Sequence, residues 1–117
     1  MTLSVWFVLT PNVLLLDYAG PAEALRMAAE LAGEESAVAD GDAPAAMVLH
    51  SCAPVAELPT SLGVGLGGLE ALPARLPPRS LVIVTGNACE VEDYARPEAQ
   101  AVVAWLRRAP QSDTHVA

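Results

Sequence analysis

Three short apolar runs divide the chain and predict the strands of a sheet. The first, Leu3–Leu9, is apolar almost throughout and rich in β-branched and aromatic residues. The second, Ala46–Ser51, and the third, Leu81–Thr85, have the same continuous character. Continuous rather than alternating hydrophobicity is typical of parallel strands that are covered on both faces. The pattern therefore predicts an α/β fold in which the three runs are neighbouring central strands of a parallel sheet.

Two segments between and after these runs have helical spacing. One helix is predicted to begin at Pro21, because proline suits the first helical position, and to end at Gly33. A second helix is predicted to open at Pro97–Glu98 and to end before Pro110. Helices that alternate with parallel strands imply a three-layer sandwich. The residues expected on the apolar faces are Ala22, Leu25, Ala29 and Ala32 in the first helix and Ala99, Val102, Val103 and Leu106 in the second.

The remaining segments are rich in turns or incomplete. Ala53–Ser80 is interrupted by prolines and glycines, which predicts small hairpins and turns in an ordered connection. Thr114–Ala117 resembles the first half of a fourth buried strand. Because three and a half strands do not complete such a sheet, we expect residues 1–117 to be the N-terminal part of a longer protein.

Composition and charge narrow the class of protein. Of 117 residues, 53% are hydrophobic, as in one globular domain, and six basic residues against 14 acidic ones give a net charge of −8. Phosphate backbones would be repelled, so this segment is not expected to bind nucleic acid. The first apolar stretch is broken by Pro11–Asn12, which excludes a secretory signal or a membrane span. Two cysteines are too few for a disulfide framework, so a cytoplasmic location is predicted.

Several residues that could carry chemistry have a simpler structural interpretation. Gly63–Gly68 matches the dinucleotide motif G-x-G-x-x-G, but no buried strand precedes it and prolines exclude a long helix after it, which favours a flexible turn. Acidic residues after Cys89 would raise the pKa of its thiol, which argues against a nucleophile. Cys52, His50 and His115 lie in apolar runs without metal-ligand spacing and are interpreted as packing residues. Neither a metal nor a cofactor is expected.

Asp17 is the most informative acidic residue. It stands between an apolar segment and the predicted helix start at Pro21, at the carboxyl end of the first strand unit. Open α/β sheets bind ligands at that edge, where a partly desolvated carboxylate is suited to proton transfer. Capping of the following helix is an equally good explanation of the same residue.

Four segments resemble one family in the order that the family has them. Leu15–Glu23 is similar to the LLD-x-x-G-P-x-E opening of the ThiJ/PfpI group in the class I glutamine amidotransferase-like superfamily. Pro59–Val64 is similar to its S-x-G-L segment, and Leu81–Gly86 to its D-x-L-v-v-P-G-G strand. Val103–Arg108 is similar to L-x-x-W-L-R-R. Together the motifs span nearly the whole chain and are most similar to the sensor-like domain of AraC-type transcription regulators.

The resemblance implies a flavodoxin-like fold and a set of site residues. In the family, a nucleophilic cysteine follows the strand that begins near His115, so the chain would end just before this nucleophile elbow. Asp17 corresponds to a carboxylate beside that cysteine, and Gly86 and Asn87 correspond to a Gly-Gly pair that contributes an oxyanion site. Asn87 replaces the second glycine of the pair, and Thr85 replaces the usual proline. We expect Asp17 to lie within a few ångströms of Gly86–Asn87 and to line one pocket with them.

These observations lead to three functional hypotheses. The first is a small-molecule-sensing N-terminal domain of an AraC-type regulator, homodimeric, whose DNA-binding domain would lie beyond residue 117. The second is a stand-alone ThiJ/PfpI enzyme, such as an isonitrile hydratase-like lyase or a cysteine hydrolase, in which Asp17 donates or accepts a proton. The third is a scaffold domain that only dimerises. The 117-residue chain itself is expected to be catalytically inert.

Overall fold

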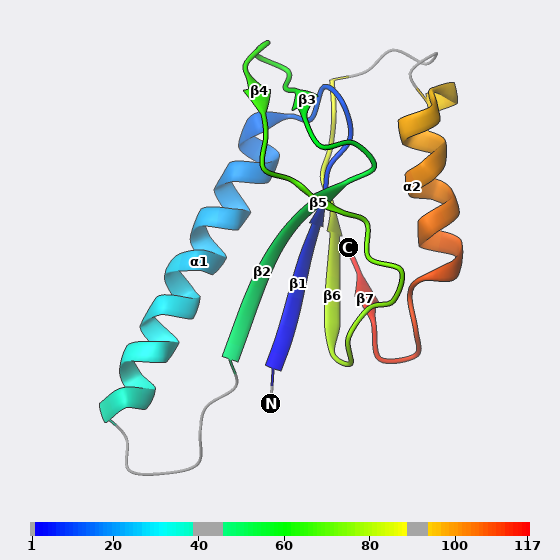
Figure 1. Cartoon of the computed structure of the whole chain (residues 1–117). Coiled ribbons are helices and arrows are strands. Elements are labelled where there is room, and N and C mark those ends of the chain that lie inside the picture. The colour runs from blue at the N-terminus through cyan, green and yellow to red at the C-terminus, as the bar shows by residue number, and fades with distance from the viewer. Residues whose placement is uncertain (1, 39–45, 89–93) are drawn as a thin grey trace.

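A parallel five-stranded sheet forms the centre of the molecule (Figure 1). The computed structural model describes residues 2–38, 46–88 and 94–117. The strands of the sheet are ordered β5–β2–β1–β6–β7, and each neighbouring pair runs parallel. The predicted α/β fold, with the three apolar runs as neighbouring central strands, is confirmed. The elements in chain order are β1 (Thr2–Val8), α1 (Leu15–Val38), β2 (Ala46–Ala53), β3 (Leu58–Pro59), β4 (Gly65–Leu66), β5 (Glu70–Ala71), β6 (Ser80–Val84), α2 (Pro97–Arg108) and β7 (His115–Val116).

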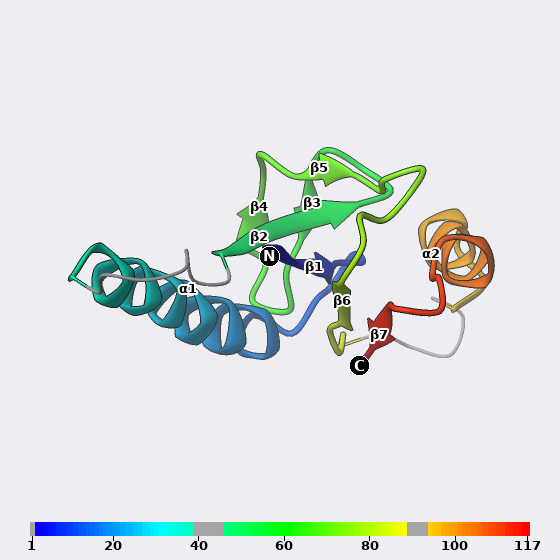
Figure 2. The same cartoon turned by 90° about the horizontal axis from the view of Figure 1, so that it is seen from below.

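The two helices lie on opposite faces of this sheet and make it the middle of three layers (Figure 2). Side chains alternate along β1, so Trp6 and Val8 join the buried cluster that contains Trp105 of α2. Phe7 faces the other way, into the cluster against which Leu25 of α1 packs. The arrangement is consistent with a flavodoxin-like sandwich. In the part of the chain that the structure describes, neither helix combines the length and hydropathy needed to cross a bilayer.

Helix α1 begins earlier and ends later than the sequence predicted. It starts at Leu15, so Pro21 lies inside the helix and not at its first position. Proline has no N–H to donate to the Asp17 carbonyl and normally restricts the residue before it. That residue is Gly20, whose missing Cβ relieves the clash, so the helix continues through the proline. It also continues through Gly33, which was predicted to end it.

Replacing Gly33 by alanine is expected to stabilise the fold. Gly33 lies inside α1, and a Cβ built on it meets no heavy atom within 4 Å. Alanine loses less backbone entropy on folding, so the free energy of unfolding should rise by about 0.5–1 kcal/mol in urea denaturation. Gly68→Ala is the control, because this equally uncrowded residue has φ +69° and should lose stability instead. Equal effects of the two substitutions would contradict this explanation.

Helix α2 follows its predicted bounds, although one residue of its predicted face is misplaced. Val102 and Trp105 are buried, whereas Val103 is 38% exposed. The buried face therefore runs through Trp105, which is fully enclosed and donates its indole N–H to the Pro73 carbonyl over 2.7 Å. This hydrogen bond ties α2 to the connection that precedes β6.

The connection between β2 and β6 is built from short strands, as its prolines and glycines predicted. Strands β3 and β4 pair antiparallel, and Gly63 in the turn between them has φ +81°. The glycine-rich motif Gly63–Gly68 thus lies in and after a hairpin, and the next element is the short strand β5. Because the element directly after the motif is a strand and not a helix, the structural context of a dinucleotide site is missing.

Candidate functional site

The connections that leave the carboxyl ends of β1 and β6 run toward opposite edges of the sheet. From β1 the chain crosses by α1 to β2 on one side, whereas from β6 it crosses by α2 to β7 on the other. Crossovers of one hand that run in opposite directions place their helices on opposite faces. The loops after β1 and β6 meet at this point, where hydrogen bonds join them. Parallel α/β sheets bind ligands at this kind of switch point.

The loop after β1 is held between two other segments. Asn12 takes a left-handed conformation with φ +65°, which asparagine tolerates better than most residues. Its N–H donates to the Pro59 carbonyl, and its carbonyl accepts from the Ala88 N–H, each over 2.8 Å. The next residue, Val13, is buried and forms bridges to both Thr60 and Asn87. The hairpin and the loop after β6 thus fix the conformation of the loop after β1.

Asp17 and Gly86 come together at this edge, as expected from the sequence. Asp17 is exposed in the first turn of α1, and the Leu14 N–H donates to the Gly86 carbonyl over 2.9 Å. A Cβ built on Gly86 would lie only 2.8 Å from Asp17 Oδ2 and 3.4 Å from Leu14 Cδ1. A glycine at this position is what allows the carboxylate to approach the backbone after β6. The carboxylate is also well placed for the positive end of the α1 dipole.

Asn87 does not use the left-handed backbone conformation that asparagine tolerates. Among the described residues other than glycine, only Asn12 and Arg79 have positive φ, so the loop after β6 does not need this conformation at Asn87. Its side chain instead donates from Nδ2 to Thr10 Oγ1 over 2.8 Å. Asn87 therefore links the two loops at the switch point.

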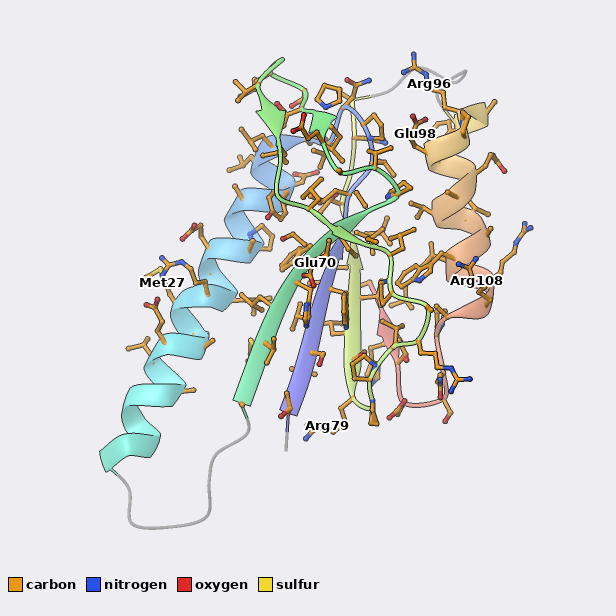
Figure 3. The ribbon with its side chains drawn as sticks, in the orientation of Figure 1. Met27, Glu70, Arg79, Arg96, Glu98 and Arg108 are labelled. Atoms are coloured by element: carbon orange, nitrogen blue, oxygen red, sulfur yellow. The ribbon has the colours of Figure 1, made fainter. Side chains whose placement is uncertain are left out.

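A small cavity opens beside these loops, and Asp17 does not line it. The cavity measures about 10 Å³, which is room for roughly one water molecule. Asn87 lies in its wall, but Asp17 belongs to α1, on the other face of the sheet from α2. The expectation that Asp17, Gly86 and Asn87 line a single pocket is therefore wrong for this cavity. Its lining residues are Thr10, Pro11, Asn12, Asn87, Arg96, Glu98 and Ala99, and Figure 3 shows Arg96 and Glu98 beside the start of α2.

Sequence reasoning missed the contribution of α2 to this edge. Arg96 precedes the helix and Glu98 lies in its first turn, so both sit near the switch point. The available signal was Pro97, which predicted a helix start a few residues after the end of a parallel strand. The loops that follow parallel strands lie at the carboxyl edge of the sheet, so a helix start in this loop would have placed both side chains near Asn87.

The remaining candidate residues lie away from this edge or outside the described chain. His50 stacks on Trp6 with ring centroids 3.8 Å apart, and its Nδ1 lies 3.0 Å from Glu70 Oε2. Trp6 Nε1 is buried without a hydrogen-bond partner. His115 is exposed in β7. Cys89 falls outside the described residues, which contain no group of three or more His, Cys, Asp or Glu side chains able to hold a metal.

Cys52 is a packing residue, as interpreted from the sequence. It is fully buried in the cluster between the sheet and α2, and its thiol donates to the Phe7 carbonyl over 3.5 Å. Burial, with a smaller contribution from the negative charge of Glu70, raises the pKa of this thiol to about 12. A thiol in this state is a poor nucleophile at neutral pH.

The chain matches no protein-family model, no curated protein and no solved structure. The resemblance to ThiJ/PfpI proteins therefore stays a prediction from the motifs. The candidate site is the switch point, where Asp17 meets Gly86 and the Asn87 side chain bridges two loops.

Proposed function

We propose that this chain is the N-terminal part of a ligand-sensing domain similar to the ThiJ/PfpI domains of AraC-type transcription regulators. One observation carries the proposal: the exposed Asp17 carboxylate reaches the backbone of Gly86 at the switch point of a parallel sheet. In such a regulator the domain binds a small molecule in the cytoplasm. DNA binding belongs to another part of the regulator, because the chain carries a net charge of −8.

The groups at the switch point define what kind of ligand they would recognise. The Asp17 carboxylate accepts hydrogen bonds, so it favours a ligand that presents N–H or O–H groups. Gly86 has no side chain, which lets the Asp17 carboxylate lie close to the main chain, so a ligand bound to Asp17 would lie beside the loop after β6. A small polar molecule such as an amide or a hydrated carbonyl compound carries both hydrogen-bond donors and acceptors and has a suitable size.

The ligand test uses Asp17→Asn in the full-length protein, with acetamide and methylglyoxal as probes followed by NMR chemical shifts. We expect shifts around residues 10–14, 17 and 86–88, and an affinity at least tenfold weaker in the variant, because the amide has no negative charge and replaces one of the two acceptor oxygens by an NH2 donor. Glu23→Gln is the matched control, since it removes another exposed acid of α1 and should leave binding unchanged.

A second variant separates the charge of the site from its geometry. Gly86→Ala keeps the Asp17 charge but displaces the carboxylate, because the new Cβ would lie 2.8 Å from Oδ2. It should weaken probe binding as Asp17→Asn does. If Asp17→Asn leaves binding intact and sharply lowers the melting temperature, Asp17 is a structural residue of the α1 start and the site is misassigned.

The exposure of Asp17 favours one alternative, a catalytic function. A reacting molecule can reach the carboxylate from solvent, where it could donate or accept a proton. This is the role it would have in a stand-alone enzyme such as an isonitrile hydratase-like lyase. Incubation of the full-length protein with cyclohexyl isonitrile distinguishes the two functions: formation of the N-substituted formamide indicates the enzyme, and binding without product indicates the sensor.

A further inference from the structure

A cleft opens at the amino ends of β1, β6 and β7, at the opposite edge of the sheet from the switch point. It measures about 440 Å³, which lies within the usual range of sites for small molecules. Helix α1 diverges from β6 and β7 toward this edge, so it does not cover them there (Figure 1). The cleft is lined by Leu3, Arg79, Ser80, Leu81, Asp113 and His115.

The base of the cleft is apolar. Leu3 and Leu81 belong to the adjacent strands β1 and β6, and both pack partly buried against the core cluster on the α1 side of the sheet. His115 pairs with Leu81 in the register of β6 and β7, so its side chain stands on the same side of the sheet. A ligand in the cleft would therefore rest a hydrocarbon part on the two leucines.

Arg79 supplies a positive charge, and its backbone is fixed on both sides. Its φ is +58°, a left-handed conformation that is uncommon for a residue other than glycine. The Arg79 N–H donates to Asp113 Oδ2 over 3.0 Å, and its carbonyl accepts from the Ser4 N–H over 3.1 Å. Figure 3 shows Arg79 at the amino end of β6. Within the part of the chain that the structure describes, its guanidinium has neither a hydrogen bond nor an ion pair, so it is available to an anionic group from outside.

Asp113 supplies the opposite charge. Its carboxylate accepts from the Arg79 backbone, but it forms no ion pair with the Arg79 guanidinium or with any other described residue. Two opposite charges that line one cleft without pairing with each other are complementary to a ligand that carries both charges. A carboxylate of the ligand would pair with Arg79, and an ammonium group with Asp113.

We propose that this cleft binds a free amino acid with an apolar side chain, independently of the function proposed above. The carboxylate of the ligand pairs with Arg79, its ammonium group pairs with Asp113, and its side chain lies on Leu3 and Leu81. A fatty acid or a simple amine carries only one of the two charges, and so does either end of a peptide. The net charge of −8 also disfavours a purely anionic ligand.

The first test compares three compounds in NMR titrations of the 117-residue protein. L-Leucine carries both charges, 4-methylpentanoate lacks the ammonium group, and 3-methylbutylamine lacks the carboxylate. L-Leucine should shift the resonances of residues 79–81 and 113–115 and bind about tenfold more tightly than the other two, because each of those loses one charged hydrogen bond. Equal affinity for the three compounds, or shifts confined to the switch point, would contradict the proposal.

The second test uses Arg79→Gly to separate binding from folding. Glycine takes a positive φ without the steric cost of a Cβ, so the variant should melt at or above the temperature of the original protein. Its affinity for L-leucine should nevertheless fall about tenfold. Arg75→Ala is the matched control, because Arg75 is an exposed arginine of the same connection and lies outside the cleft. Undiminished binding to Arg79→Gly, or an equal loss in Arg75→Ala, would overturn the proposal.

A third variant tests the ammonium subsite alone. Asp113→Asn keeps an acceptor oxygen for the Arg79 N–H but loses the negative charge. The variant should therefore bind L-leucine and 4-methylpentanoate with about the same affinity, because the ammonium group no longer has a partner. If Asp113→Asn still prefers L-leucine tenfold, Asp113 does not bind the ammonium group and the assignment of an amino acid is wrong.

Discussion

Replacing Trp105 by alanine should lower the free energy of unfolding by about 3–5 kcal/mol, the usual cost of removing a large buried aromatic side chain. Trp105 is fully buried and packs with Val82 of β6 and Leu76 of the preceding connection. Its removal leaves a cavity between the sheet and α2 and eliminates the hydrogen bond from the indole N–H to the Pro73 carbonyl. Because domains of this kind are stable by only about 5–15 kcal/mol, a large part of the fold's stability should be lost. Urea denaturation measures the change.

Two further substitutions show whether the loss comes from packing or from the hydrogen bond. Trp105→Phe retains most of the ring volume but has no N–H for Pro73, so its cost should lie between zero and that of alanine. Val103→Ala, on the exposed side of the same helix, should change the free energy of unfolding by less than about 0.5 kcal/mol. A cost of Trp105→Ala as small as that of Val103→Ala would show that the packing of Trp105 does not contribute to the stability of the fold.

Alkaline pH should destabilise the protein through Cys52. Burial raises the pKa of its thiol from the ordinary 9.0 to about 12, so between these values the unfolded chain loses a proton that the folded chain keeps. The free energy of unfolding should therefore be unaffected by this group below pH 9 and fall as pH rises toward 12. The slope is at most about 1.4 kcal/mol per pH unit, which corresponds to one proton.

The contribution of Cys52 is the difference between two variants in a Cys89→Ser background, which removes the second thiol. Cys52→Ala in this background should show a shallower loss of stability above pH 9, because it has no thiol to titrate. All other groups are the same in both proteins, so their contributions cancel in the comparison. Identical slopes for the two proteins would mean that the thiol ionises as easily in the folded chain as in the unfolded one.

The central strands could be predicted from the sequence because the sheet is covered on both sides. Leu3–Leu9 is apolar at successive positions, since Trp6 and Phe7 enter different buried clusters. The start of α1 could not be predicted in the same way. Pro21 is a local signal for a first turn, but Val13 and Leu14 are fixed by hydrogen bonds and bridges to distant segments, which let the helix begin at Leu15.

In the candidate site, too, some contacts could be predicted from the sequence and others depend on residues that are far apart in the chain. Two lines predicted the meeting of Asp17 with Gly86: β1 and β6 end at the same edge, and the family resemblance implies an acid beside the loop after β6. The cavity wall that Arg96 and Glu98 form depends on where α2 begins relative to the loops. The bond from Asn87 to Thr10 joins residues 77 positions apart, and no local pattern indicates it.

The parallel register of the sheet has a consequence for how the chain assembles. Val8 pairs with Cys52, 44 residues later, and with Val84, 76 residues later. Contacts between such distant residues require the closure of long loops, which slows folding. During synthesis, β1 leaves the ribosome before either neighbour exists, and its apolar faces stay uncovered until they arrive. The strand at the centre of the described sheet is therefore made before both of its neighbours, and its two apolar faces are exposed to aggregation until they are covered.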